Sequence, residues 1–262
     1  MKIHSMHCYF ILAGNAAVPI VYYVENVRSG RSYATRSVQA KQKGQTIFTT
    51  TCSFTRSVSG DTDEPKRTVQ HSIKFPREVP SPEDCLTGAQ TIDKWLSEGK
   101  VDAEVAESLK EHEANEPFEF RRAGIVNDTP ETDPTHKLQR QWVRARGNIS
   151  DEGAHLPALA YFSDNLLLGT ASKVNPQARS GQVGMTVSLD HAIYFHNARN
   201  TRVDRWLLVE SDSPWAADER ALVTRRIWDP EVGLLATCYQ EGLMRLKDGR
   251  EGEGENHVIS KL

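Results

Sequence analysis

Short runs in which apolar and polar residues alternate occur twice along the chain, in the same order and separated by turn residues. Alternation with a period of two is typical of strands that bury one face, and it is clearest in 31–40 and 220–228. Each copy contains four of these runs, so the sequence predicts a duplicated unit of antiparallel strands. The runs lie at 7–10, 20–24, 31–40 and 44–56 in the first copy, and at 191–195, 206–209, 220–227 and 233–245 in the second.

The second copy is preceded by segments that the first copy lacks. Residues 118–126 and 137–146 have the pattern of two further strands, and residues 151–172 are Ala-rich and apolar on nearly every side. This last segment is long enough for a buried helix, and Asp151 suits its first turn, where negative charge meets the helix dipole. Proline is tolerated in the first turn of a helix, so we expect the regular part to begin at Pro157.

A sheet wrapped around one long buried helix is the hotdog arrangement, an α+β fold that the sequence predicts for residues 117–247. Residues 1–56 are expected to form an incomplete N-terminal hotdog that lacks its first strand and its helix. Four strands with an uncovered apolar face would be unstable alone. Two explanations stay open: the chain is a truncated or misassembled gene product, or another surface covers that face.

Two segments lie outside these halves. Residues 57–116 are expected to be a linker, polar at first and then interrupted by prolines. Within this linker, residues 91–113 have the spacing of one charged, amphipathic helix that packs across the halves. Residues 248–262 are rich in Gly and Glu, and we expect a flexible tail there.

Composition argues against several classes of protein. Hydrophobic residues make up 38% of the 262 residues, which is enough for a core, and the formal net charge of −3 argues against a nucleic-acid partner. No apolar run is long enough to span a bilayer. The cysteines, Cys8, Cys52, Cys85 and Cys238, form no Cys-x-x-Cys pair and have no His at metal-ligand spacing. We therefore expect buried or incidental thiols, no metal and no cofactor.

Several blocks of sequence in both copies resemble the type II acyl-CoA thioesterases. The blocks of the second copy are Leu-Asp-His-Ala-Ile-Tyr-Phe-His at 189–196, Trp-Leu-Leu at 206–208 and Gln-Glu-Gly-Leu-Met-Arg at 240–245. Those of the first copy are His-Ser-Met-His-Cys-Tyr-Phe at 4–10, Gly-Arg-Ser-Tyr-Ala-Thr-Arg at 30–36, and Ile-Phe at 47–48 followed by Ser-Phe at 53–54. The resemblance covers most of the chain and is weakest through 57–116.

The resemblance implies a double hotdog that hydrolyses fatty acyl-CoA to free acid and coenzyme A, as a part of fatty acid metabolism. It also implies three catalytic residues that hold a nucleophilic water. They are Asp164 in the Phe-Ser-Asp-Asn block at 162–165, Ser188 two residues before Asp190, and Gln240 at the start of the Gln-Glu-Gly block. Ser188 stands where many family members have Thr, which keeps the hydroxyl and loses a methyl group.

These three residue types suit that chemistry. A carboxylate in an apolar segment is costly unless it is paired, and Asp164 can accept a proton from water. Ser188 and Gln240 can orient the same water by hydrogen bonds. Backbone N–H groups near a helix start are expected to stabilise the oxyanion. Each residue alone also fits a structural role: a solvent-facing Asp, a strand Ser and an edge Gln.

The chain ends in Ser260-Lys261-Leu262, a tripeptide that acts as a receptor-read address for the peroxisome when it is C-terminal. A given terminal tripeptide arises by chance in roughly one chain in ten thousand. The sequence therefore predicts a peroxisomal matrix protein whose partners are acyl-CoA and the peroxisomal import receptor. A homo-oligomer stays open.

Other residues suggest sites that the sequence supports less well. His191 and His196 have no third ligand at a suitable spacing, so we expect structural roles, with a possible hydrogen-bonding or packing pair between Asp190 and His191. Three arginines of one strand, Arg220, Arg225 and Arg226, could contact coenzyme A phosphates or form a solvated face.

The chain has neither the Gly-x-Ser-x-Gly elbow of hydrolases with a nucleophilic serine nor a Gly-rich loop that binds phosphates. The sequence therefore does not support either of these two classes. The hydratases that share the hotdog fold would need an Asp and a His four residues apart in one loop, and we find no such pair. The main alternative to hydrolysis is a non-catalytic acyl-CoA-binding or regulatory protein, because the N-terminal hotdog is incomplete.

Overall fold

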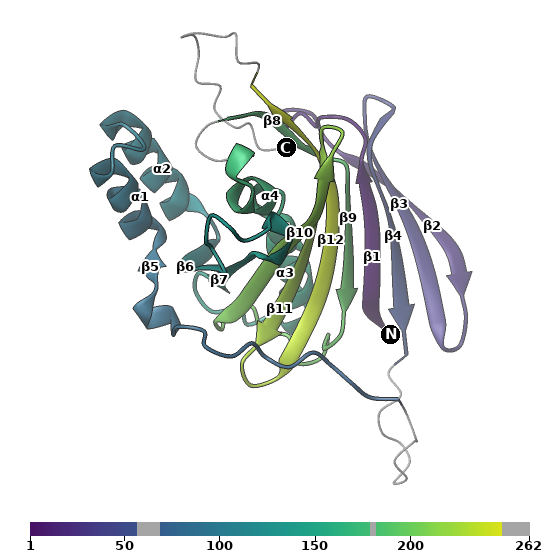
Figure 1. Cartoon of the computed structure of the whole chain (residues 1–262). Helices are drawn as coiled ribbons and strands as arrows, with labels where there is room; N and C mark the ends of the chain where they lie inside the picture. Colours follow the sequence, from purple (N-terminus) through teal and green to yellow (C-terminus); the bar gives the residue numbers. More distant parts are fainter. Residues whose placement is uncertain (57–68, 179–181, 248–262) are drawn as a thin grey trace.

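The computed structural model describes residues 1–56, 69–178 and 182–247, whose strands form one twelve-stranded antiparallel sheet (Figure 1). The predicted α+β class is confirmed. The strands are β1 (Lys2–Phe10), β2 (Val21–Ser29), β3 (Tyr33–Gln42), β4 (Gln45–Thr55), β5 (Leu86–Thr87), β6 (Phe118–Val126), β7 (Leu138–Ala145), β8 (Val183–Ser188), β9 (Asp190–Phe195), β10 (Leu207–Ala217), β11 (Arg220–Asp229) and β12 (Gly233–Leu246). The α-helices are α1 (Gly88–Ser97), α2 (Ala103–Asn115), α3 (His155–Asp164) and α4 (Gly169–Val174).

The order of the strands repeats the duplication seen in the sequence. The sheet runs β2-β3-β4-β1-β9-β12-β11-β10-β7-β6-β5, with β8 paired to β12. Read outward from the β1–β9 pair, the first block has the order β1-β4-β3-β2 and the second has the equivalent order β9-β12-β11-β10. The two blocks join where β1 pairs with β9, with Cys8 opposite His191 and His7 opposite Ala192. The Cys8 thiol donates a hydrogen bond to the His191 carbonyl at 3.2 Å, which links the two halves in a buried position.

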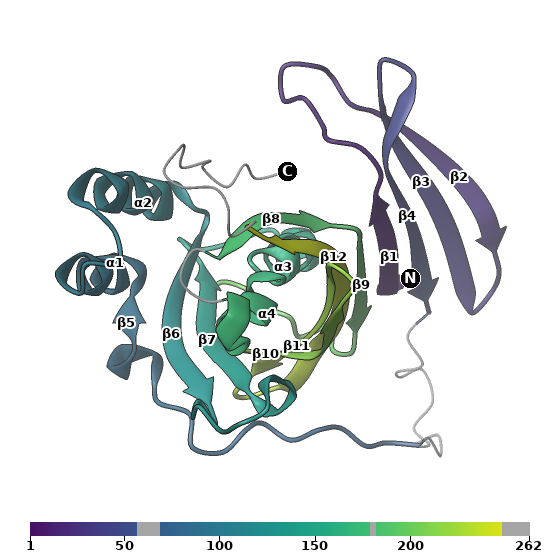
Figure 2. The ribbon, with the colours of Figure 1, turned by 45° about the horizontal axis from the view of Figure 1, so that its top comes forward.

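The C-terminal half wraps its strands around α3 and α4, which gives the predicted hotdog arrangement (Figure 2). Leu159 and Phe162 of α3 are buried against apolar residues of the strands, among them Val143, Leu207 and Ile227. Each fully buried side chain of this kind stabilises the fold by about 1.5–3 kcal/mol. This half therefore has the core that fixes the position of α3.

The single buried helix expected over 151–172 is wrong, because the segment contains two helices. Leu166 has a φ of 54°, a left-handed conformation that a helix cannot continue through. The break turns Leu167 and Leu168 into the core, where they are 0% and 5% exposed. Pro157 lies in the first turn of α3, as expected, although the helix begins two residues earlier.

The N-terminal sheet, β1 to β4, extends away from this core, and Figure 2 shows no helix over it within the described residues. Phe10, Phe48, Ala40 and Tyr22 follow one another across β1, β4, β3 and β2, so they share one face of the sheet. Every residue of β2 is exposed. This face of the N-terminal sheet therefore carries apolar side chains and is not covered by a helix of the described residues, as predicted.

The linker contains two helices where one was predicted over 91–113. Gly99 has a φ of 67°, which ends the first helical segment, and Asp102 caps α2 by accepting a 2.8 Å hydrogen bond from the Val105 amide. The two helices pack beside each other, at the edge of the sheet formed by β5 and β6 (Figure 1). None of the helices in the described ranges is both long and apolar enough to cross a bilayer.

Candidate active site

Asp164, Ser188 and Gln240 come from three elements that meet inside the C-terminal half. Asp164 is the last residue of α3, Ser188 the last residue of β8, and Gln240 lies within β12. Strand β12 pairs with both β8 and β9, with Gly242 opposite Ser188. This pairing brings the hydroxyl of Ser188 to the strand that carries Gln240.

The side chain of Gln240 connects the other two residues. Its Nε2 atom donates a hydrogen bond to Oδ1 of Asp164 and lies 3.3 Å from Oγ of Ser188. Gln240 is 1% exposed, and its Oε1 atom has no hydrogen-bond partner among the described residues. Asp164 and Ser188 are half-buried. A carboxylate, a hydroxyl and an amide nitrogen thus gather at one place beside two half-buried residues, where they can bind and deprotonate water.

A buried histidine holds the residue before Asp164. The Ser163 hydroxyl donates to the Ala160 carbonyl at 2.8 Å and lies 2.9 Å from Nε2 of His191. Since the one hydroxyl proton is used, His191 donates from Nε2, and burial lowers its pKa so that the ring is neutral at neutral pH. His191 has a structural role here, as the sequence predicted.

The suggested hydrogen bond between Asp190 and His191 is absent. Adjacent residues of a strand point to opposite faces, so the two side chains diverge. Asp190 instead accepts a 2.8 Å hydrogen bond from the Glu241 amide, next to Gln240. His196 is 2.9 Å from the Thr237 hydroxyl, at the surface.

The three arginines of β11 have partners within the protein, and this changes the phosphate-binding hypothesis. Arg220 forms a 2.9 Å ion pair with Glu241, and Arg226 lies 3.6 Å from Asp212 and 3.8 Å from Glu210. Arg225 is 1% exposed, so the suggestion of a solvated or phosphate-binding arginine is wrong for this residue. Alternation along the strand explains the difference, because position 225 faces α3 and its neighbour at 226 faces outward.

Sequence reasoning missed the contacts that two residues make near the site. One is Arg225, whose guanidinium contacts the end of α3. The other is Gly242, where an added Cβ would overlap Leu168 and would lie 2.8 Å from the Val187 carbonyl. The Gln-Glu-Gly block already marked Gly242, but a close approach between β12 and the segment after α3 is a tertiary property.

That backbone N–H groups near a helix start stabilise the oxyanion stays a prediction, and the start of α3 is not near Asp164. That helix rises about 14 Å between His155 and Asp164, so its N-terminus is distant from the carboxylate.

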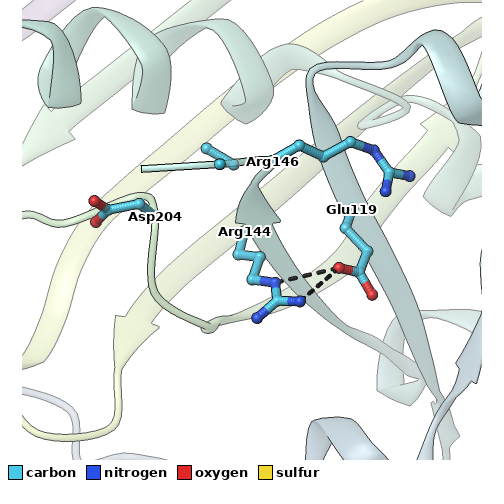
Figure 3. Close-up of a pocket in the computed structure, with 6 residues that line it drawn as sticks. Glu119, Arg144, Arg146 and Asp204 are labelled. Atoms are coloured by element: carbon cyan, nitrogen blue, oxygen red, sulfur yellow. Dashed lines mark hydrogen bonds and ion pairs between the residues drawn. The ribbon is translucent and has the colours of Figure 1, made fainter. Parts of the chain in front are cut away.

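A polar pocket of about 420 Å³ lies elsewhere, lined by Glu119, Arg144, Ala145, Arg146, Gly147 and Asp204 (Figure 3). Its charges are already paired, as in the 2.9 Å contact between Arg144 and Glu119. This pocket contains none of the three predicted catalytic residues.

The described residues contain no group of three or more His, Cys, Asp or Glu side chains that could hold a metal ion. The four cysteines are free, and Cys8, Cys85 and Cys238 are buried. Burial raises the pKa of the Cys8 and Cys238 thiols to about 12, which keeps both protonated and unreactive at neutral pH.

Two family models match the chain. The model of the acyl-CoA thioesterase N-terminal domain matches residues 1–55, and that of the acyl-CoA thioesterase C-terminal domain matches residues 82–244. The second match alone covers more than half of the chain and includes all three predicted catalytic residues.

Individual proteins agree with the family models. Acyl-coenzyme A thioesterase 8 of Mus musculus is 38% identical over 252 residues, which cover 94% of this chain and 74% of the relative. Peroxisomal acyl-coenzyme A thioester hydrolase 1 of Saccharomyces cerevisiae is 25% identical, with 91% of this chain and 78% of the relative covered. The crystal structure of the acyl-CoA thioesterase II TesB2 of Mycobacterium marinum has a TM-score of 0.70 and 31% identity, and the match covers 95% of this chain and 82% of that one.

Proposed function

Because the chain belongs to the type II acyl-CoA thioesterase family, a family of thioester hydrolases, we propose that Asp164, Ser188 and Gln240 activate the water that attacks its acyl-CoA substrate. The reaction converts a fatty acyl-CoA and water to a free fatty acid and coenzyme A. The observation that carries the assignment of the residues is the hydrogen bond from Gln240 to Asp164, with Ser188 3.3 Å from the same amide nitrogen.

Asp164 is the general base in this mechanism. It accepts a proton from water while the water oxygen attacks the thioester carbonyl carbon, and the carbonyl π electrons move to its oxygen. The tetrahedral intermediate then collapses with cleavage of the C–S bond, and the proton returns from Asp164 to the departing thiolate. A thioester is an activated acyl group, so no covalent enzyme intermediate is required.

Ser188 and Gln240 orient the water. The hydroxyl of Ser188 and the Nε2 amide of Gln240, which lies beside both Asp164 and Ser188, can hydrogen-bond to it, and such positioning contributes a large part of the rate of many enzymes. The Nε2 atom of Gln240 fixes the Asp164 carboxylate at the same time. Gln240 thus fixes the position of the base, Asp164, relative to the nucleophilic water.

Release of coenzyme A thiol from a long-chain acyl-CoA tests this assignment. The full chain should release thiol, and Asp164→Ala should reduce kcat by about a hundredfold or more, within the range for loss of a general base. Asp212→Ala, which alters a partly buried carboxylate on the opposite side of the sheet, serves as the control. Wild-type kcat in Asp164→Ala would refute the proposed role.

The alternative, a non-catalytic acyl-CoA-binding protein, has no support from the comparisons, in which the matched relatives are named as thioesterases or thioester hydrolases. The same assay distinguishes the two functions. Binding of acyl-CoA without thiol release would favour the alternative, and release that depends on Asp164 would favour hydrolysis.

We further propose that the protein works in fatty acid metabolism in the peroxisomal matrix, and that Ser260-Lys261-Leu262 binds the import receptor. This tripeptide lies outside the described residues. The yeast relative, whose name places it in the peroxisome, supports the proposal. A fluorescent protein fused before Met1 should enter peroxisomes, and deletion of Leu262 should leave it in the cytosol.

The sequence analysis also left open whether the protein forms a homo-oligomer. Light scattering of the purified chain measures its oligomeric state.

A further inference from the structure

We propose that Arg225 is a positioning residue that holds Asp164 in its catalytic geometry by binding the backbone on both sides of it. This inference rests on the proposed role of Asp164. Nη1 of Arg225 lies 2.9 Å from the carbonyl oxygen of Ser163, 3.1 Å from that of Asn165 and 3.2 Å from that of Phe162. Asp164 is the residue between two of these three carbonyls.

The guanidinium is itself fixed in place. Its Nε atom donates a 3.1 Å hydrogen bond to the Ser211 hydroxyl on the neighbouring strand β10. Arg225 is 1% exposed and Ser211 is 2% exposed, so neither side chain can move without opening the core. The planar fork of an arginine can bind a hydroxyl on one side and carbonyls on the other, which a lysine cannot do.

The location of the charge also explains why a buried cation is tolerated here. The last carbonyls of a helix have no partner within the helix and carry the negative end of its dipole. Burial lowers the pKa of Arg225 to about 10, so the side chain is still a cation at neutral pH. A cation at this end of α3 offsets the unfavourable position of the Asp164 carboxylate at the same end.

These contacts act on catalysis through geometry. Leu166 has a left-handed backbone, so the chain turns sharply just after Asp164. The Arg225 contacts on Ser163 and Asn165 define the direction of the backbone before this turn, and hence the direction in which the Asp164 side chain leaves it. A displacement of a catalytic group by about 1 Å can cost a hundredfold in rate.

The test compares Arg225→Lys with Asp164→Ala and with the double variant, using the full chain. We expect Arg225→Lys to lower kcat by about ten- to a hundredfold with KM within about twofold, because positioning affects the chemical step. In the Asp164→Ala background, the same substitution should have no further effect on the residual rate. Lys137→Met is the control, since it removes another cation that is 1% exposed, one whose partner is Asp128. It should lower Tm and leave kcat unchanged.

A purely structural role for Arg225 gives different results. Wild-type kcat in Arg225→Lys, measured well below its Tm, would refute the inference, as would an equal loss of kcat with and without Asp164. If the lysine variant does not fold, Ser211→Ala replaces it, because it removes a single hydrogen bond to the guanidinium. It should lower kcat about threefold in the presence of Asp164 and not in its absence, and an unchanged kcat would refute the inference. If Asp164→Ala has wild-type kcat, the proposed function fails instead.

Discussion

The amide of Gln240 on β12 donates a hydrogen bond to the carboxylate of Asp164 at the end of α3, across 76 positions of the chain. A carboxylate only accepts hydrogen bonds, so the amide is oriented with its nitrogen toward Asp164 and its oxygen away from it. That oxygen is buried and has no partner among the described residues. The relationship therefore fixes the orientation of the Asp164 carboxylate, with the amide nitrogen of Gln240 on the side of the proposed water.

Replacement of Gln240 should affect activity much more than stability. Gln240→Ala should lower kcat by about ten- to a hundredfold, because the water and Asp164 both lose an orienting group. The cost in the free energy of unfolding should be about 1–2 kcal/mol, since one hydrogen bond and a few packing contacts are lost. Steady-state thiol release and thermal unfolding measure the two effects.

Gln139→Ala is the matched control for Gln240. Gln139 is also buried, on β7, and its Oε1 atom also lacks a partner within the described part of the chain. We expect a similar change in Tm and an unchanged kcat. Equal losses of activity in the two variants would mean that Gln240 acts through packing alone.

Substitutions of Ser188 separate the hydroxyl from its surroundings. Ser188→Ala should reduce kcat by about tenfold because one of the two groups that orient water is lost. Ser188→Thr keeps the hydroxyl, and the half-buried position leaves room for a methyl group, so its kcat should stay within about threefold of wild type. Similar activities of the Ala and Thr variants would remove Ser188 from the mechanism.

The buried thiols predict a loss of stability in alkali. The pKa of Cys8 and of Cys238 is raised by burial to about 12, from 9.0 for a free thiol. Above pH 9 the unfolded chain loses these protons while the folded chain keeps them, so the free energy of unfolding should fall between pH 9 and 12. Denaturant titrations at several pH values measure this fall, and Cys238→Ala should make it less steep.

The same thiols should resist alkylation in the folded protein. At pH 8, Cys8 and Cys238 should react slowly with iodoacetamide, whereas half-buried Cys52 should react faster. Mass spectrometry of the native and the denatured chain identifies the labelled cysteines. Rapid labelling of Cys238 in the native protein would contradict its burial at 0% exposure.

Much of the fold could be predicted from the sequence because strand periodicity is a local property. The duplicated strand blocks and their common order are confirmed, and so is the hotdog arrangement of the C-terminal half. The single central helix was wrong because its break depends on burial of Leu167 and Leu168, which the continuous apolar run does not reveal. In the same way, the charged pattern of the linker did not distinguish one helix from two separated at Gly99.

For the candidate site as well, the sequence predicted some of the residues, whereas contacts that depend on tertiary packing could not be predicted. The resemblance identified Asp164, Ser188 and Gln240, and the structure brings them together, while their catalytic roles stay predictions. Arg225 was interpreted as a surface or phosphate-binding residue because two adjacent arginines of a strand point to opposite faces, and the sequence does not indicate which face is covered by a helix. Its contacts with α3 depend on how the sheet curls around that helix, and this curvature cannot be predicted from any single segment of the sequence.

Gly242 gives the last prediction, which concerns packing next to the site. It lies opposite Ser188, and an added Cβ would overlap Leu168 and approach the Val187 carbonyl to 2.8 Å. Gly242→Ala should therefore destabilise the fold by about 1–3 kcal/mol, the usual cost of overpacking, and should lower kcat by displacing the strand that carries Ser188.

Gly169→Ala is the control for this effect, because there the nearest atom to a new Cβ would be Nζ of Lys173 at 3.8 Å, an ordinary contact. It should change neither Tm nor kcat appreciably. The double variant Gly242→Ala with Leu168→Ala removes the overlap with the leucine but not the contact with the backbone of β8. It should recover part of the kcat lost in Gly242→Ala. Wild-type Tm and kcat in Gly242→Ala alone would show that β12 and Leu168 can separate without cost to the site.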